Sequence, residues 1–193
     1  MLKGFIAGVL ATIVVGLAVA YVGITQGLLI PANADAKPSK MERWAASRSL
    51  GATIKREMPT QPNPVAATDV NYLAAIKLYG ENCSVCHGVP GERSTAIAIG
   101  LYQHAPQLAR HGVEDDPDGE TYWKIEHGIR MTGMPAFTTT LSEEQIWTLA
   151  LFLKHMDKLP AAADRAWKSL RVPVALAPLS ALPSPSPGSS STH

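Results

Sequence analysis

Two cysteines and a histidine lie within five residues, in the stretch NCSVCHG that covers residues 82–88. They are Cys83, Cys86 and His87, and the chain of 193 residues has no other cysteine. The spacing C-x-x-C-H is the pattern to which haem is attached covalently. Each thiol can form a thioether with one vinyl group of the porphyrin, and the adjacent imidazole can bind the iron as an axial ligand. The sequence therefore predicts one haem c, attached through Cys83 and Cys86, with His87 on the iron.

Other uses of a cysteine pair fit the sequence less well. Cysteines three residues apart are too close to link distant parts of a fold through a disulfide. A thioredoxin-like redox site requires a βαβ setting, and no segment of this chain alternates as a strand would. A structural zinc site requires four ligands, commonly two cysteine pairs, and the chain has one pair. Haem attachment is the chemistry that these two thiols suit.

A haem iron held by His87 needs a second axial donor, and the stretch MTGMPAF (residues 131–137) contains two methionines. We predict that Met134 is this ligand, because Gly133 allows close approach of the backbone and Pro135 restricts how the loop continues. A thioether opposite a histidine raises the reduction potential of the iron. Three other methionines are interpreted as fillers of gaps in the core: Met58, Met131 and Met156. Three histidines keep bis-histidine ligation open as an alternative: His104, His111 and His127.

The segments around these residues have the patterns of helices. Residues 69–83 carry apolar side chains at helical spacing, and Asp69 is the expected N-cap. In residues 141–156, a capping box that begins at Ser142 precedes an apolar stripe. Residues 118–128 predict a short helix that ends at its final glycine. Since no convincing strand is evident, the sequence predicts a small all-α domain.

Residues 4–30 form an apolar run without a charged side chain. As a helix this run would be about 40 Å long, and roughly 20 residues are enough to span a bilayer core. We predict an uncleaved transmembrane anchor, because the apolar core of a signal peptide usually has about 7–15 residues. A cleaved signal peptide is the alternative, since ANA (residues 32–34) resembles a cleavage site. A buried core helix is a third reading, but Gln26 is the only strongly polar side chain on any face.

The order of several motifs resembles that of class I c-type cytochromes. C-x-x-C-H at residues 83–87 is followed by APQL at residues 105–108, by GMP at residues 133–135 and by a last helix that contains a tryptophan. The resemblance covers roughly residues 69–158. It implies three to five helices around one covalently bound haem, with the first and last helices in contact. The residues that would meet there are Tyr79 and Gly80 on one side and Leu149, Phe152 or Leu153 on the other.

The same resemblance implies contacts around the cofactor. The carbonyl group of Pro106 would accept a hydrogen bond from the imidazole of His87 and so fix its orientation, with Pro90 as an alternative acceptor. Three further side chains would line the haem: Leu108, Trp123 and Ile129. With Cys83, Cys86, His87 and Met134 these complete the predicted cofactor-binding residues, and no catalytic residue is predicted.

Composition divides the chain into four parts. They are the anchor (1–31), a basic juxtamembrane segment with a Pro-rich linker (32–67), the haem domain (68–159), and a tail rich in Pro, Ala and Ser that we expect to be largely disordered (160–193). The pattern of residues 39–58 allows a helix, which Gly51 disfavours, and residues 163–170 of the tail allow a turn of helix. The formal net charge of +1 gives no argument for binding nucleic acid. Residues 31–67 contain six basic and three acidic residues, whereas residues 68–158 contain seven basic and twelve acidic ones. We expect the basic segment to lie along anionic lipid head groups or an acidic subunit.

With His87 and Met134 on the two axial positions the iron would have no open site, so we predict an electron-transfer protein and not an enzyme. It would be a tethered shuttle or a subunit of a respiratory or photosynthetic complex, with redox proteins as partners and no small-molecule substrate. The flanks resemble those of membrane-anchored bacterial members of the family. This implies a single pass through the cytoplasmic membrane, with the helix in lipid and the haem domain on the periplasmic side. The alternative is a haem enzyme or ligand sensor, peroxidase-like or gas-binding, in which the sixth ligand is labile.

Overall fold

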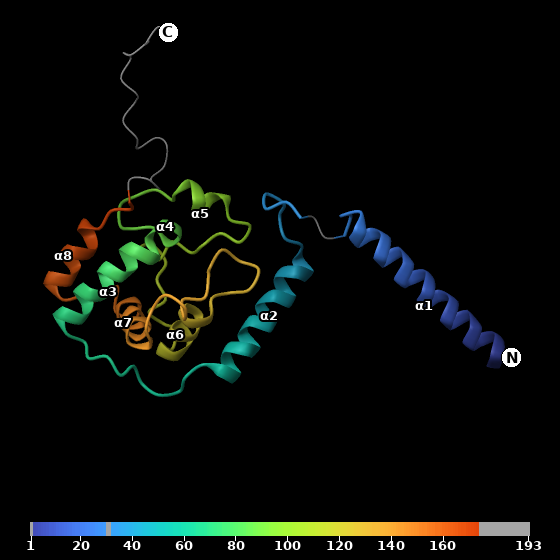
Figure 1. Ribbon diagram of the computed structural model, residues 1–193, viewed down its shortest axis with the longest axis horizontal. Coiled ribbons are helices and arrows are strands. Elements are labelled where there is room, and N and C mark those ends of the chain that lie inside the picture. The colour runs from blue at the N-terminus through green and yellow to red at the C-terminus, as the bar shows by residue number, and fades with distance from the viewer. Residues whose placement is uncertain (1, 30–31, 174–193) are drawn as a thin grey trace, which may run out of the picture. The chain divides into compact units, whose positions relative to one another are not determined.

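The computed structural model describes residues 2–29 and 32–173, so the last part of the predicted tail lies outside the described residues. These residues form eight helices and no strand, which confirms the all-α class. The chain divides into two units, Met1–Lys37 and Pro38–His193, which are described separately below (Figure 1).

The first unit contains the helix α1 (Leu2–Thr25), which includes a window of 18 residues with a mean hydropathy of 2.5. At 24 residues it is about 36 Å long, and it has the length and composition of a membrane span or of a signal sequence. It ends before the apolar run does, because Gly27 takes a positive φ of 69° and the N–H groups of residues 28 and 29 turn back to the carbonyl of Gly23. The helix fits a membrane anchor.

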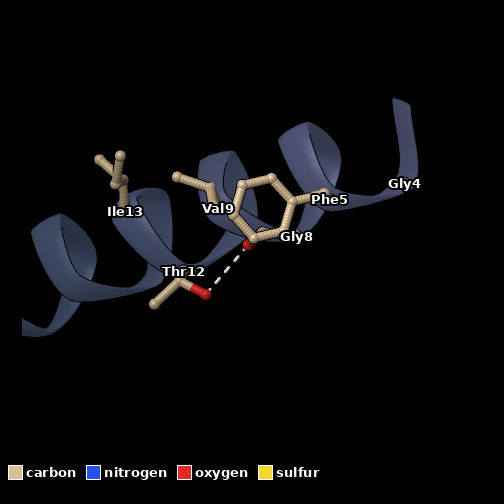
Figure 2. A pocket seen from close by; sticks show the side chains of 6 residues that line it. All are labelled: Gly4, Phe5, Gly8, Val9, Thr12 and Ile13. Carbon is tan, nitrogen blue, oxygen red and sulfur yellow. Dashed lines mark hydrogen bonds between the residues drawn. The ribbon is translucent and has the colours of Figure 1, made fainter. Parts of the chain in front are cut away.

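The surface of α1 includes a shallow groove lined by six residues (Figure 2): Gly4, Phe5, Gly8, Val9, Thr12 and Ile13. The hydroxyl of Thr12 donates a hydrogen bond to the carbonyl of Gly8 at 3.0 Å, and that of Thr25 donates to the carbonyl of Tyr21 at 2.9 Å. Polar groups are costly in lipid unless they are satisfied internally. The hydroxyls of both threonines of α1 are therefore hydrogen-bonded within the helix, as a membrane-spanning helix requires.

The second unit is built around four helices that contact one another (Figure 1): α3 (Asp69–Asn82), α6 (Asp118–His127), α7 (Glu143–Lys154) and α8 (Ala161–Ser169). Helix α7 is buried on nearly every side and packs against both α3 and α6. Tyr79 of α3 meets Phe152 of α7 edge to face, with ring centroids 5.7 Å apart, and Tyr122 of α6 stacks on Trp147 at 4.1 Å. Such aromatic pairs stabilise the fold beyond the contribution of the apolar area that they bury. The expected contact between the first and last helices of the haem domain is present.

Local signals define the ends of these helices. The capping box that begins at Ser142 is present, with the hydroxyl accepting from the N–H of Gln145. Helix α6 ends at Gly128, as predicted. The prediction of Asp69 as an N-cap is wrong by one residue: the hydroxyl of Thr68 accepts from the N–H of Asn71, and Asp69 is the first helical residue. An acidic residue in the first turn still interacts favourably with the helix dipole.

The segment assigned to a disordered tail begins with a folded helix. Ala163 and Trp167 of α8 are buried, and Trp167 meets both Tyr79 and Phe152 edge to face at centroid distances of 5.1 Å. Gly80 faces Leu170 just after this helix, since a Cβ at Gly80 would lie 2.9 Å from the Leu170 side chain. The folded unit therefore continues past residue 159, because one tryptophan supplies an anchor that the Ala- and Pro-rich composition conceals.

One short helix carries most of the predicted haem-attachment motif, and another follows it. The four-residue α4 (Ser84–His87) directly follows α3, and α5 (Ala96–Gly100) comes after a short loop. A longer helix, α2 (Lys40–Glu57), contacts α6 and begins with a complete capping box between Ser39 and Glu42. This confirms the helix that the sequence allowed over residues 39–58.

Candidate haem site

The motif C-x-x-C-H lies in a tight turn between two helices. Cys83 ends α3, since its N–H bonds to the carbonyl of Tyr79, and it also begins α4. Gly88 then ends α4 with a positive φ of 74°, a conformation that glycine adopts without strain. The two thiols and the imidazole are thus carried on one short helical segment, at the end of a helix whose inner face is fixed in the core.

The backbone of this turn is held by three segments of the chain. The carbonyl oxygens of four consecutive residues, 85–88, each accept a hydrogen bond: from Thr95 Oγ1 at 2.6 Å, Gln107 Nε2 at 2.9 Å, the N–H of Leu108 at 3.1 Å and Tyr79 Oη at 2.8 Å, in that order. Because the donors come from α3, from the start of α5 and from the APQL stretch, the turn cannot change its conformation without breaking tertiary contacts. Such a turn presents its side chains in one fixed arrangement.

The imidazole of His87 has a defined orientation. Its Nδ1 lies 2.9 Å from the carbonyl oxygen of Pro106. Since a carbonyl only accepts, Nδ1 carries the proton and donates, which leaves the lone pair of Nε2 available in the neutral ring. Burial lowers the pKa of His87, and the hydrogen bond to Pro106 opposes this shift. A neutral imidazole with a free Nε2 is the form that binds a metal.

Both cysteines are free thiols in partly buried positions. Burial, with a smaller contribution from the neighbouring Cys86, raises the pKa of Cys83 to about 12. Burial also raises the pKa of Cys86. Cys83 packs against the hydrophobic core. The two thiols are therefore protonated at neutral pH and lie at the boundary between the core and the surface.

The loop that carries Met134 is closed by a tight backbone contact. Gly128 has a φ of 64°, and a Cβ at this position would lie 2.5–2.6 Å from backbone atoms of Met134 and Pro135. The N–H of Ile129 donates to the carbonyl of Met134 at 3.1 Å, and the Thr132 hydroxyl accepts from the Met134 N–H at 3.1 Å. The side chain of Met134 is partly buried against the core. The loop thus has a fixed shape that holds Met134 inward.

Met131 behaves differently from Met134. Its side chain is 88% exposed, and its φ of 60° is positive. The prediction that Met131 fills a gap in the core is therefore wrong. The difference between the two methionines of MTGMPAF is decided by the turn of the loop and could not be seen from their spacing.

Of the remaining predicted site residues, Leu108 precedes α6 in the chain, Trp123 lies within it and Ile129 follows it. Leu108 is 7% exposed and directly follows the Pro106 segment that bonds to His87. Trp123 is also 7% exposed, and Ile129 is partly buried beside the Met134 loop. One group therefore consists of His87 with Pro106 and Leu108, and the other of Trp123 with the loop from Ile129 to Met134.

The side chains present fit a haem. Two thiols, a neutral imidazole with a free nitrogen and a thioether form the donor set that covalent attachment and axial ligation require. The indole Nε1 of Trp123 is buried without a hydrogen-bond partner among the described residues, so it is available to an acceptor such as a haem carboxylate. The Glu57 carboxylate lies near this indole, and its pKa is lowered chiefly by Arg56 and slightly by Trp123, but the approach does not have the geometry of a hydrogen bond.

Some residues that shape the site were missed by the sequence analysis. The amide of Gln107 also donates to the carbonyl of Ala105 at 3.2 Å, so it ties the APQL stretch to the turn. Thr95 bonds to the turn and also caps α5. Gln107 lies between Pro106 and Leu108, two residues that the resemblance does place at the site. Its position between them was the signal that could have identified it. Thr95 carried no signal beyond its place ahead of a short apolar run.

Residues that could form other metal sites do not gather in the described part of the chain, where no cluster of three or more His, Cys, Asp or Glu side chains is suited to a metal ion. Residues 114–120, EDDPDGE, are the sharpest acidic cluster of the chain, and their charges are partly paired within the domain. Lys124 binds Asp116 at 2.9 Å and Glu120 at 2.6 Å, while Lys154 donates to the carbonyls of Glu114 and Asp116.

Comparison with known proteins identifies the folded region. Residues 70–153 match the family model described as cytochrome c oxidase, cbb3-type, subunit III. Quinohemoprotein alcohol dehydrogenase ADH IIB of Pseudomonas putida is 27% identical over 96 residues, which are 50% of this chain and 13% of that protein. The chain thus resembles only a small part of that relative, and no solved structure matches it. Together with the all-α fold and the motif at the end of α3, the match shows that residues 70–153 form a c-type cytochrome domain.

Proposed function

We propose that this protein is a mono-haem c-type cytochrome that carries single electrons outside the cytoplasmic membrane, to which α1 tethers it. Haem would be attached through Cys83 and Cys86, with His87 and Met134 as axial ligands. The observation that carries the proposal is the hydrogen bond of 2.9 Å between His87 Nδ1 and the carbonyl of Pro106, within a turn held at four consecutive carbonyls. This arrangement fixes the tautomer and direction of the ring that binds the iron.

The residues of the chain have separable tasks in this function. When bound, haem supplies an iron that gains or loses one electron. Pro106 holds the His87 ring with Nε2 free, and the closed loop from Gly128 to Pro135 presents the thioether of Met134. Leu108 and Trp123, both nearly buried, would exclude water from the cofactor and so favour the less charged, reduced state. Filling both axial positions leaves no site for a substrate, which supports electron transfer over catalysis.

The membrane tether rests on the composition of α1 and on the location of haem attachment. Helix α1 has the length and hydropathy of a membrane span, and its threonine hydroxyls bond within the helix. Class I cytochromes, which the motifs resemble, receive their haem on the export side of the membrane. We therefore propose a single-pass protein with its cytochrome domain in the periplasm.

The names of the similar proteins support association with a larger oxidoreductase. The matching family is described as a subunit of a cytochrome oxidase, and the similar Pseudomonas putida protein is an alcohol dehydrogenase that contains the matched segment as a minor part. The first description names a subunit of an oxidase and the second a haem-containing dehydrogenase, so both are names of oxidoreductases. We propose that redox proteins of a membrane electron-transport chain are the partners of this domain.

The proposal is tested by replacing the two methionines of the loop in turn. Met134→Ala is expected to lower the reduction potential and to allow carbon monoxide to bind the reduced iron, because an axial ligand is lost. Met131→Ala is the matched control, since this side chain is 88% exposed and is expected to leave both properties unchanged. The measurements are a redox titration and absorption spectra of the purified, haem-loaded protein with and without carbon monoxide.

Two results would contradict the assignment. If Met134→Ala changed neither the potential nor carbon monoxide binding, Met134 would not be a ligand. If the unaltered protein already bound carbon monoxide readily, its sixth position would be labile, and a haem enzyme or ligand sensor would become the better description.

A further inference from the structure

Helix α2 is fixed to the cytochrome domain by one of its faces. Ile54 is 5% exposed and packs inward. The hydroxyl of Tyr102 donates a hydrogen bond to the carboxylate of Glu42 near the start of the helix. Just beyond its end, the carbonyl of Pro59 lies so close to Gly119 of α6 that a Cβ on this glycine would clash with it. The C-terminal end of α2 is therefore packed on the domain, and a side-chain hydrogen bond to Tyr102 links its N-terminal part, in which residues 41–49 are exposed.

The opposite face of α2 points away from the domain and carries a distinct set of side chains. With 3.6 residues per turn, four residues fall within an arc of about 60°: Met41, Trp44, Arg48 and Lys55. Met41 is 77% exposed and Trp44 is 64% exposed, although both are large and apolar. Arg48 and Lys55 are also exposed. We call these four residues the outer face of α2; the helix itself runs along the edge of the second unit (Figure 1).

The outer face of α2 contains no acidic residue. The two acidic residues of the helix, Glu42 and Glu57, lie about 130° and 170° away from the centre of the outer face. The basic residues of that face therefore have no acidic neighbour on it. The haem domain itself is acidic, with twelve acidic and seven basic residues between positions 68 and 158. An anionic surface would repel most of the domain and attract the outer face of α2, so it would select one orientation.

The sequence places this face close to the proposed membrane anchor. Fourteen residues separate the end of α1 at Thr25 from the start of α2 at Lys40, and fully extended they reach at most about 50 Å. A tryptophan beside basic residues is typical of the membrane–water interface, where the indole lies among head groups. On a helix that faces water, exposed Trp and Met side chains leave apolar surface hydrated and gain no such contact.

We propose that the outer face of α2 docks on the anionic phospholipid surface of the membrane in which α1 is anchored. Arg48 and Lys55 would pair with phosphate groups, while Trp44 and Met41 would reach the boundary between the head groups and the acyl chains. Because α2 is joined to the domain through Ile54, Pro59 and Glu42, this contact orients the cytochrome domain relative to the membrane and does more than tether it. The inference rests on the proposed anchoring by α1.

The test uses Trp44 as its own probe in the full-length, haem-loaded protein. The other three tryptophans, Trp123, Trp147 and Trp167, are at most 7% exposed. The protein is reconstituted into vesicles of phosphatidylcholine with brominated acyl chains, with or without phosphatidylglycerol. Bromine quenches only a fluorophore that reaches the acyl region. We expect quenching in the anionic vesicles, little in the zwitterionic ones, and its loss in Trp44→Phe and at 1 M salt, where screening is nearly complete.

A double charge reversal separates electrostatic docking from accidental contact. Each basic residue near an anionic surface contributes about fivefold to the ratio of docked to undocked protein, so Arg48→Glu with Lys55→Glu should reduce it by at least about 25-fold. Lys77→Glu with Arg93→Glu is the matched control, since both residues are exposed on the cytochrome domain. It should leave quenching unchanged.

The outcomes distinguish the two proposals. Co-flotation with vesicles but no quenching of Trp44 would overturn lipid docking alone, leaving an acidic protein as the occupant of this face. No co-flotation with either vesicle would overturn both docking and anchoring. Equal quenching in the two kinds of vesicle, or equal losses in the double reversal and its control, would also overturn the proposal.

Discussion

The hydroxyl of Tyr79 is the most direct test of how the haem-attachment turn is held. Tyr79 is fully buried, and its hydroxyl donates a hydrogen bond of 2.8 Å to the carbonyl of Gly88, the residue that follows His87. Gly88 is buried as well. In Tyr79→Phe the carbonyl would lose its partner with no access to water. Leaving a buried acceptor unsatisfied costs about 1–3 kcal/mol, and we expect the free energy of unfolding to fall by this amount.

Tyr72 provides a control in the same helix. Its ring is 4% exposed and meets His155 edge-on, with centroids 6.0 Å apart. The described residues give its hydroxyl no hydrogen bond, and this oxygen is not among the buried, unpaired atoms. Tyr72→Phe should therefore change the free energy of unfolding by no more than about 0.5 kcal/mol.

The assay is chemical unfolding of the full-length, haem-loaded protein in detergent, followed through the haem absorption. The informative quantity is the difference between the two tyrosine variants, because both remove one hydroxyl from α3. Equal losses in Tyr79→Phe and Tyr72→Phe would refute the reasoning, since the turn would then not depend on this hydrogen bond.

Two further predictions concern the loop of Met134 and the acidic stretch before α6. Gly128→Ala should lower the free energy of unfolding by about 2–4 kcal/mol, because a side chain there is strained at positive φ and clashes with the backbone of Met134 and Pro135. Gly100→Ala, where a Cβ would meet open space, should cost nothing; similar unfolding midpoints for the two variants would contradict the close approach. Lys124→Met should cost about 1–2 kcal/mol through loss of its partly buried pairs with Asp116 and Glu120, whereas Lys77→Met, which removes an exposed pair of 3.9 Å, should cost under about 0.5 kcal/mol. Burial alone would lower the pKa of Lys124, but the two carboxylates outweigh this effect and raise that pKa. The stabilisation by these pairs is therefore complete below the pKa of an unfolded lysine and is lost as the pH rises through the pKa of folded Lys124. If the unfolding midpoints of the unaltered protein and of Lys124→Met fell equally at alkaline pH, Lys124 would not have this role.

The sequence determined the features that depend on short stretches of chain. The motif of Cys83, Cys86 and His87 needs only its own spacing, and the main helices α3, α6 and α7 were predicted because their caps and apolar stripes are local. The same holds for α2, whose capping box lies within four residues. These interactions form between neighbours, so they can be read before the fold is known.

The resemblance to class I cytochromes offered alternatives between which the sequence alone could not decide. Pro106 and Pro90 were both candidates to accept from His87, and the fold placed Pro106 there. The two positions differ in how the chain returns after α5, and no local pattern encodes this return. Whether these residues hold haem stays a prediction, which the methionine variants test.

Only the tertiary structure decided where distant segments meet. Donors from α3, from the start of α5 and from the APQL stretch converge on four adjacent carbonyls, and Trp167 turns an Ala-rich segment into the folded helix α8. The outer face of α2 also follows from the fold, since only docking through Ile54 and Glu42 shows which side of the helix remains free. Such contacts join residues that are 9 to 88 positions apart, and their free energy appears only when the chain is packed. Local propensity therefore fixes which helices form, and packing fixes which of their residues can reach one another.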